Sequence, residues 1–74
     1  MAELYLKRQW HYEALICVPE NFDRIRELTD FDPVMLPAGV VIPYCVETET
    51  VEYPLCVDMT EFDERYELEE VNDG

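Results

Sequence analysis

The sequence predicts a small α+β domain in the order strand, helix, helix, strand, followed by an extra strand or hairpin and an acidic C-terminal extension. A chain of 74 residues, 49% of them hydrophobic, can form one domain with a small core. A Pro-Ala-Gly turn runs directly into the β-branched residues 40–42, which is typical of a strand. The net charge of −13 is unevenly placed: residues 1–26 hold four bases and four acids, whereas residues 27–74 hold fourteen acids and one base.

The first elements are expected to be a short strand and a helix. Residues 3–8 could form a short strand, because their two leucines would then lie on one side and the tyrosine on the other. Residues 10–18 are broadly apolar and stop at Pro19, a length that suits a two-turn helix. We favour the helix, although Ile16-Cys17-Val18 would also suit a strand and periodicity does not separate the two in so short a run.

The second helix is the clearest element in the sequence and is expected over residues 19–29. Pro19 suits the first turn of a helix, and the acids near it suit the positive end of the helix dipole. One apolar stripe recurs every third residue, at Phe22, Ile25 and Leu28. Asp30-Phe31-Asp32-Pro33 then ends the helix, because the residue before proline avoids the α region.

The segment Leu36–Pro43 is predicted to be a turn that opens the closing strand of this unit. Pro37 fixes its own φ and Gly39 can take a positive φ, so a tight bend is favourable there. The strand is expected from about Gly39 to Ile42, and the segment from Pro37 to Pro43 should be buried.

Beyond Pro43 the chain alternates in polarity, and the apolar parity switches at Thr50-Val51, which predicts a bulge, a turn or two separate strands. Any strand that contains Pro54 should be an edge strand. We place one domain at residues 1–58 and an acidic arm at residues 59–74, which is expected to be flexible or ordered by a partner.

No catalytic or metal-binding pattern is present in the sequence. There is no serine, one histidine, and no CxxC, HExxH or glycine-rich phosphate loop. His11 and three cysteines could in principle hold zinc, but structural zinc sites usually bring their ligands in close pairs. We therefore expect no enzyme activity, no cofactor and no metal. The odd cysteine count indicates a reducing compartment, with Cys17, Cys45 and Cys56 as small buried hydrophobes.

The predicted element order and the segment Leu36-Pro37-Ala38-Gly39-Val40-Val41-Ile42-Pro43 resemble the tail protein X family of contractile-tailed phages, which is built on a lysin-motif-like fold. The resemblance covers residues 4–43 and implies a βααβ unit that acts as a structural part of a tail. Gln9-Trp10 stands where the family usually has Gly-Asp, and Asp32-Pro33 stands where it tends to have Asn-Pro. With the strong negative charge, these departures argue against peptidoglycan binding.

Three functions are consistent with these observations. The first is a non-enzymatic adaptor of a phage-like tail that docks on basic surfaces of tail tube or hub subunits. The second is an inhibitor that mimics nucleic acid and occupies the basic groove of a host DNA-binding or defence protein. In that case Glu47, Glu49 and Glu52 would line one strand edge at a spacing close to that of phosphates. The third is a general acidic interaction module.

Partners and location follow from the charge and the N-terminus. The acidic field repels nucleic acid and anionic membranes, so the expected partners are basic proteins, and oligomerisation is left open. Neither a secretory signal nor a membrane span is expected, and the resemblance to the tail protein X family implies a location in virions and the host cytoplasm. The candidate interface residues are Trp10, Glu47, Glu49, Glu52, Phe62 and Tyr66.

Overall fold

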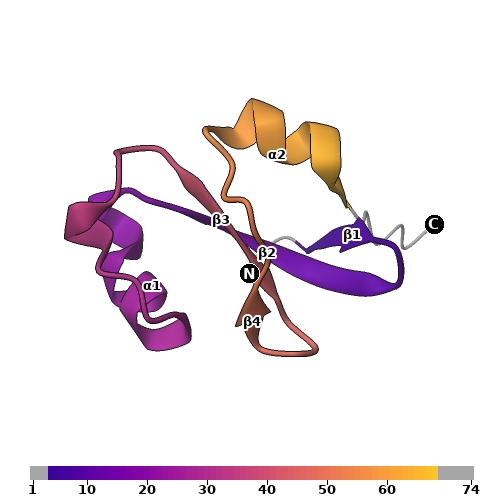
Figure 1. Cartoon of the computed structure of the whole chain (residues 1–74), viewed down its shortest axis with the longest axis horizontal. Helices are drawn as coiled ribbons and strands as arrows, with labels where there is room; N and C mark the ends of the chain where they lie inside the picture. Colours follow the sequence, from indigo (N-terminus) through magenta and orange to yellow (C-terminus); the bar gives the residue numbers. More distant parts are fainter. Residues whose placement is uncertain (1–3, 69–74) are drawn as a thin grey trace.

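The computed structural model describes residues 4–68, and it forms an α+β fold around one antiparallel sheet of five strands (Figure 1). The elements in chain order are β1 (Tyr5–Lys7), β2 (Trp10–Ile16), the 3-10 turn η1 (Pro19–Asn21), α1 (Phe22–Leu28), the 3-10 turn η2 (Pro33–Met35), β3 (Val41–Cys45), β4 (Thr50–Val51), α2 (Met59–Arg65) and β5 (Glu67–Leu68). The strand order is β4-β3-β2-β1-β5, and every neighbouring pair is antiparallel. No helix within residues 4–68 is long and apolar enough to cross a membrane.

The helix predicted over residues 10–18 was wrong, because this segment forms the long strand β2. Side chains at Tyr12, Ala14 and Ile16 pack into one apolar cluster, whereas Leu15 and Cys17 pack into another. Alternate residues of a strand point to opposite faces, so both faces of β2 are covered. A strand that is covered on both faces carries a nearly continuous apolar run and shows no clean period of two. The expected strand-helix-helix-strand order is therefore absent, since a β-hairpin precedes α1.

The second predicted helix is confirmed in its main part by η1 and α1. Ile25 has no exposed surface and anchors α1 on the sheet. The helix ends at Leu28, because Thr29 has an extended backbone while its hydroxyl and its N–H both donate to the carbonyl of Ile25. The hydroxyl of Thr29 also accepts the N–H of Phe31, which fixes the direction of the chain after the helix.

The Pro37–Pro43 segment is a surface turn followed by a buried strand. Gly39 has φ +86°, and the N–H of Val40 donates to the carbonyl of Pro37, as a turn with glycine at its third position requires. Pro37 and Ala38 are exposed, whereas all residues of β3 are buried. The expectation of burial thus holds from Val41 onward and fails at the turn.

A proline inside the central strand β3 is tolerated because of the side to which its nitrogen points. The N–H of Val46 donates to the carbonyl of His11 in β2. The even-numbered residues of β3 therefore direct their backbone hydrogen bonds toward β2. Pro43 has the opposite parity, and its carbonyl accepts the N–H of Glu52 beyond the end of β4. The missing donor of Pro43 therefore faces the two-residue edge strand β4 and removes no hydrogen bond to β2.

The switch of apolar parity at Thr50-Val51 corresponds to a hairpin. Residues 46–49 form the turn, and β4 then pairs with the end of β3 through Tyr44↔Val51 and Cys45↔Thr50. The chain leaves the sheet before Pro54 and returns for one bridge between Cys56 and Val41. Pro54 consequently lies outside any strand.

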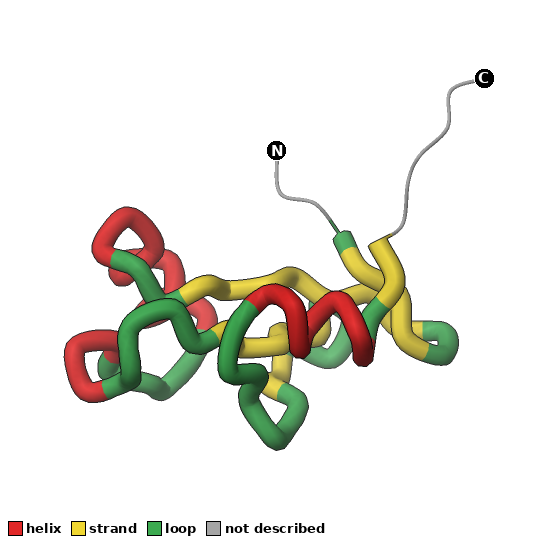
Figure 2. The backbone as a smooth tube through the Cα atoms, turned by 90° about the horizontal axis from the view of Figure 1, so that it is seen from above, coloured by secondary structure: helices red, strands yellow, loops and turns green. Residues whose placement is uncertain are grey.

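The two helices cover opposite faces of the sheet. The first cluster lies under α2 and contains Phe62 and Tyr66 with Tyr5 and Tyr12, while the second lies under α1 around Ile25. Figure 1 shows α1 and α2 on opposite sides of the ribbon formed by β2 and β3. Figure 2 shows the helical turns between β2 and β3 gathered at one end of the sheet, away from α2.

The domain boundary predicted at residue 58 is corrected by the packing of α2. Asp58 caps this helix by accepting the N–H of Glu61 at 3.0 Å, and Phe62 has no exposed surface. After the helix, β5 pairs with β1 through Leu6↔Glu67 and Tyr5↔Leu68. Residues 59–68 thus belong to the folded domain, and the remainder of the predicted arm, residues 69–74, lies outside the described residues.

Candidate functional site

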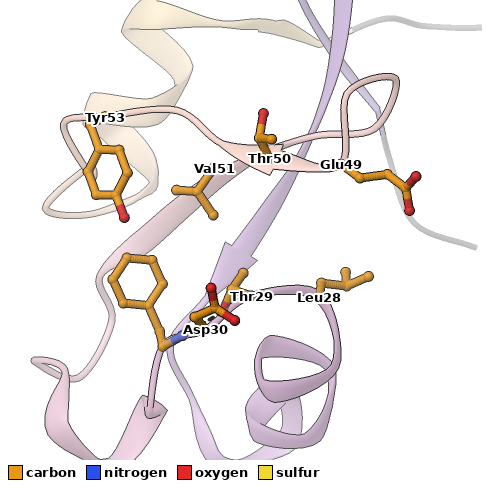
Figure 3. A pocket seen from close by; sticks show the side chains of 8 residues that line it. Leu28, Thr29, Asp30, Glu49, Thr50, Val51 and Tyr53 are labelled. Carbon is orange, nitrogen blue, oxygen red and sulfur yellow. Dashed lines mark hydrogen bonds between the residues drawn. The ribbon is translucent and has the colours of Figure 1, made fainter.

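A groove between the end of α1 and the strand β4 is the candidate site (Figure 3). It has a volume of about 440 Å³, within the range of roughly 300–1,000 Å³ that ligand pockets occupy. One wall comes from the chain just after α1, and the other comes from the hairpin turn and β4. The lining residues are Leu28, Thr29, Asp30, Phe31, Glu49, Thr50, Val51 and Tyr53.

Aromatic and aliphatic side chains form much of the surface of this groove. Tyr53 is 68% exposed, and the centroid of its ring lies 6.1 Å from that of Phe31 with an interplanar angle of 57°. Val51 lies between Tyr53 and Glu49 on the same wall, and Leu28 lies on the facing wall (Figure 3). Exposed aromatic surface of this kind is enriched in protein interfaces.

The charged residues of the groove are both acidic. Asp30 stands on one wall and Glu49 on the other, and both are exposed. The ion pairs within residues 4–68 involve neither of them. Glu49 ends the hairpin turn with φ 55°, a conformation that few residues other than glycine, asparagine and aspartate adopt readily. The groove therefore offers a negative, partly aromatic surface.

Of the residues predicted from sequence as an interface, Glu49 alone lies in this groove. Glu52 instead holds the α2 face of the sheet together. Its carboxylate accepts Lys7 Nζ at 2.8 Å, the Tyr12 hydroxyl at 2.9 Å and the Tyr66 hydroxyl at 2.6 Å. Lys7 also lies 5.0 Å from the centroid of the Tyr66 ring, at a cation–π distance.

This network shifts the pKa of Glu52 and of the two tyrosines. Partial burial alone would raise the pKa of Glu52. The hydrogen bonds from Lys7, Tyr66 and Tyr12 together lower it by more than burial raises it, and the resulting pKa is about 2. Burial, together with the hydrogen bond to Glu52, raises the pKa of Tyr12 to about 12. The same two causes raise the pKa of Tyr66. Glu52 is thus an ionised acceptor whose carboxylate is bonded within the fold.

Glu47 is also engaged within the fold. One oxygen accepts the backbone N–H of His11 at 2.8 Å, and the other lies 2.5 Å from Nδ1 of the same residue. The hydrogen bonds from the His11 side chain and backbone lower the pKa of Glu47. This carboxylate ties the β3–β4 turn to β2.

The three aromatic candidates lie elsewhere in the fold. Phe62 and Tyr66 are 0% and 2% exposed, and their rings stack with centroids 4.4 Å apart, so their expected role as exposed anchors was wrong. Trp10 is half-buried and lines a separate hollow of about 270 Å³ with Arg8 and Thr48.

The basic residues of the described chain are largely occupied by internal ion pairs. Arg24 holds Glu13 through two hydrogen bonds of 2.6 and 2.8 Å, a bidentate arrangement that secures α1 to β2. Three further pairs are Lys7–Glu52, Arg26–Asp23 and Arg65–Glu61. Exposed carboxylates without such a pair remain on the surface of residues 4–68, and they are Glu20, Glu27, Asp30, Asp32, Glu49, Asp58, Asp63, Glu64 and Glu67.

Sequence reasoning missed Asp30, Phe31 and Tyr53 as site residues. Their contact joins segments more than twenty residues apart, which no local pattern encodes. One local signal could have pointed to Phe31, because it is an aromatic residue between two acids in the turn Asp30-Phe31-Asp32. An aromatic side chain in such a polar turn often packs against another part of the surface.

The cysteines and the histidine of the described residues do not line the groove. Within residues 4–68, no group of three or more His, Cys, Asp or Glu side chains is arranged to hold a metal ion. The three cysteines are free thiols and are buried, as expected from sequence.

Comparisons with protein-family models, curated proteins and solved structures found no match to this chain.

Proposed function

We propose that this chain is a non-enzymatic adaptor that binds the basic surface of a partner protein. The observation that carries the proposal is the surplus of exposed carboxylates on residues 4–68. Four of the five basic side chains form ion pairs with acids of the same chain, so they leave most of these carboxylates unpaired. Such a surface attracts basic proteins and repels nucleic acid and anionic membranes.

The more specific form of the proposal is a structural part of a phage-like tail, present in virions and in the host cytoplasm. Its support is the segment Leu36–Pro43, which resembles the closing segment of the tail protein X family and contains a turn followed by a buried strand. The strand at Trp10–Ile16 removes the paired helices from the resemblance, so the turn and strand carry it alone.

Mimicry of nucleic acid has weaker support than the adaptor function. The row of carboxylates expected for it was Glu47, Glu49 and Glu52. Glu47 is bonded to His11, and Glu52 is bonded to Lys7 and two tyrosines. A single free carboxylate of the three does not reproduce the regular spacing of phosphates.

The tail proposal is tested by fractionating particles from cells that make the protein. A tail component should co-sediment with purified particles in a fixed copy number per particle, measured by quantitative mass spectrometry. Recovery of the protein only in the particle-free fraction would refute the tail assignment. Binding of the free protein to a basic protein, weakening steeply between 50 and 300 mM salt, would still support the adaptor function.

A further inference from the structure

We propose that the groove between α1 and β4 binds an arginine side chain presented by an extended segment of the partner. The inference rests on the proposed adaptor function and names the site at which the basic partner is recognised. The guanidinium would pack against Tyr53 and Phe31 and would pair with the carboxylate of Asp30, and Glu49 would add negative charge at the other end of the groove.

The aromatic wall favours a flat cation. Tyr53 keeps 68% of its surface exposed although it lies beside Phe31, so a face or an edge of the ring is open to a ligand. A guanidinium stacks on aromatic rings and is more weakly hydrated than an ammonium, so arginine loses less hydration than lysine on entering such a site.

The acidic residues that line the groove favour a cation as its occupant. Asp30 follows α1 and lies across the groove from Val51 and Tyr53, whereas Glu49 precedes β4 and lies at the end of the groove away from Tyr53 (Figure 3). The groove contains no basic residue among those that line it, and the internal ion pairs of residues 4–68 leave both acids available. Charge complementarity therefore selects a basic occupant.

The shape of the groove suits one long side chain on an extended backbone. Val51 and Leu28, which line it, offer apolar contact to the methylenes of arginine. Long cationic side chains commonly lay their methylenes on apolar surface while their charged ends reach polar groups. A nucleic acid would bring phosphates against two carboxylates and is excluded by the same electrostatics.

The test is a titration of ¹⁵N-labelled protein with the blocked peptide Gly-Ala-Arg-Ala-Gly, followed by amide chemical shifts at low salt. The largest shifts should fall at residues 28–31 and 49–53. The same peptide with citrulline in place of arginine keeps the shape and loses the charge, and it should bind at least about fivefold more weakly. Equal binding of the two peptides, or tighter binding of a lysine peptide, would overturn the assignment.

Matched variants separate the groove from the overall charge. Tyr53→Ala should raise the Kd about two- to fivefold, whereas Val57→Ala, which truncates another exposed apolar side chain, should leave it unchanged. Glu49→Gln should raise the Kd about twofold, whereas Glu64→Gln makes the same charge change on α2 and should have no effect. Unchanged amide spectra away from the substitution would establish that each variant is folded.

Failure of the groove and failure of the adaptor function give different results. If shifts spread over all acidic surfaces and Glu49→Gln and Glu64→Gln weaken binding equally, the groove is refuted and the adaptor function stands. If the arginine peptide causes no shifts while a basic partner protein still binds, the groove is again refuted alone. If neither the peptide nor any basic protein binds at low salt, both proposals fail.

Discussion

Replacing Glu52 by glutamine should destabilise the fold more than any other loss of a single exposed or half-exposed charge. The carboxylate accepts three hydrogen bonds that join β1, β2 and the end of α2 to the segment after β4. Its pKa is about 2, against an ordinary value of 4.5, a difference equivalent to about 3 kcal/mol of folding free energy. A quarter of its side chain (25%) is open to water, and screening there reduces the expected loss to about 2 kcal/mol.

The pH dependence of this loss identifies the charge as its cause. A carboxylate whose folded pKa is depressed stabilises the fold above its unfolded pKa of about 4.5, and the stabilisation disappears as the pH falls toward 2. The gap between the wild type and Glu52→Gln should therefore be about 2 kcal/mol at pH 7 and about 0.5 kcal/mol at pH 2.5. Protonation of the other acids affects both proteins alike and cancels in the difference.

Urea unfolding followed by circular dichroism at the two pH values measures this gap. A domain of this size has a stability near the lower end of about 5–15 kcal/mol, so the variant remains folded at pH 7 and both transitions can be fitted. Glu64→Gln serves as the control for an exposed charge and should change stability by less than about 0.5 kcal/mol at either pH. A gap that is the same at pH 7 and pH 2.5 would refute the role assigned to the ionised carboxylate.

Three further changes test the packing on the two faces of the sheet. Phe62→Ala removes a ring with no exposed surface and should cost about 3–5 kcal/mol, so the variant should lack a cooperative thermal transition; a melt like that of the wild type would contradict the packing of α2. Arg24→Ala removes the bidentate partner of the Glu13 carboxylate, and Glu13 is only 8% exposed. The free energy of unfolding measured in urea should fall by about 1–2 kcal/mol. An unchanged free energy would show that this ion pair does not stabilise the fold. Burial raises the pKa of Tyr12 from 10.0 to about 12, so the stabilisation that the neutral tyrosine gives is fully present below pH 10 and is lost as the pH rises through 12. The variant Tyr12→Phe should therefore lose less stability than the wild type at alkaline pH. A profile of stability against pH that is the same for both proteins would contradict this role of Tyr12.

Local signals in the sequence were sufficient for two elements. The stripe at Phe22, Ile25 and Leu28 has the period of a helix with one buried face, and α1 follows it. The turn before β3 depends on the positive φ of Gly39, which no other residue type there would adopt as readily.

The errors arose where tertiary contacts decide the structure. β2 is covered on both faces, so its apolar run has no period that separates a strand from a helix. In α2, only Phe62 and Met59 of the helix pack into the core, and the surrounding acids resemble those of a solvated arm. The groove unites residues 28–31 with 49–53, and the Glu52 network spans 45 residues to Lys7, so neither could be inferred from neighbours in the chain.

Site-specific photocross-linking tests most directly whether the protein recognises a basic partner through the groove. A benzophenone amino acid would replace Tyr53 in one variant and Glu64 on the opposite face in another, and both would be irradiated in the cells that natively make the protein. We expect cross-links from position 53, to peptides of one partner protein that are rich in arginine or lysine, at several times the yield from position 64. Cross-links to nucleic acid or to acidic peptides, or equal yields at the two positions, would contradict this.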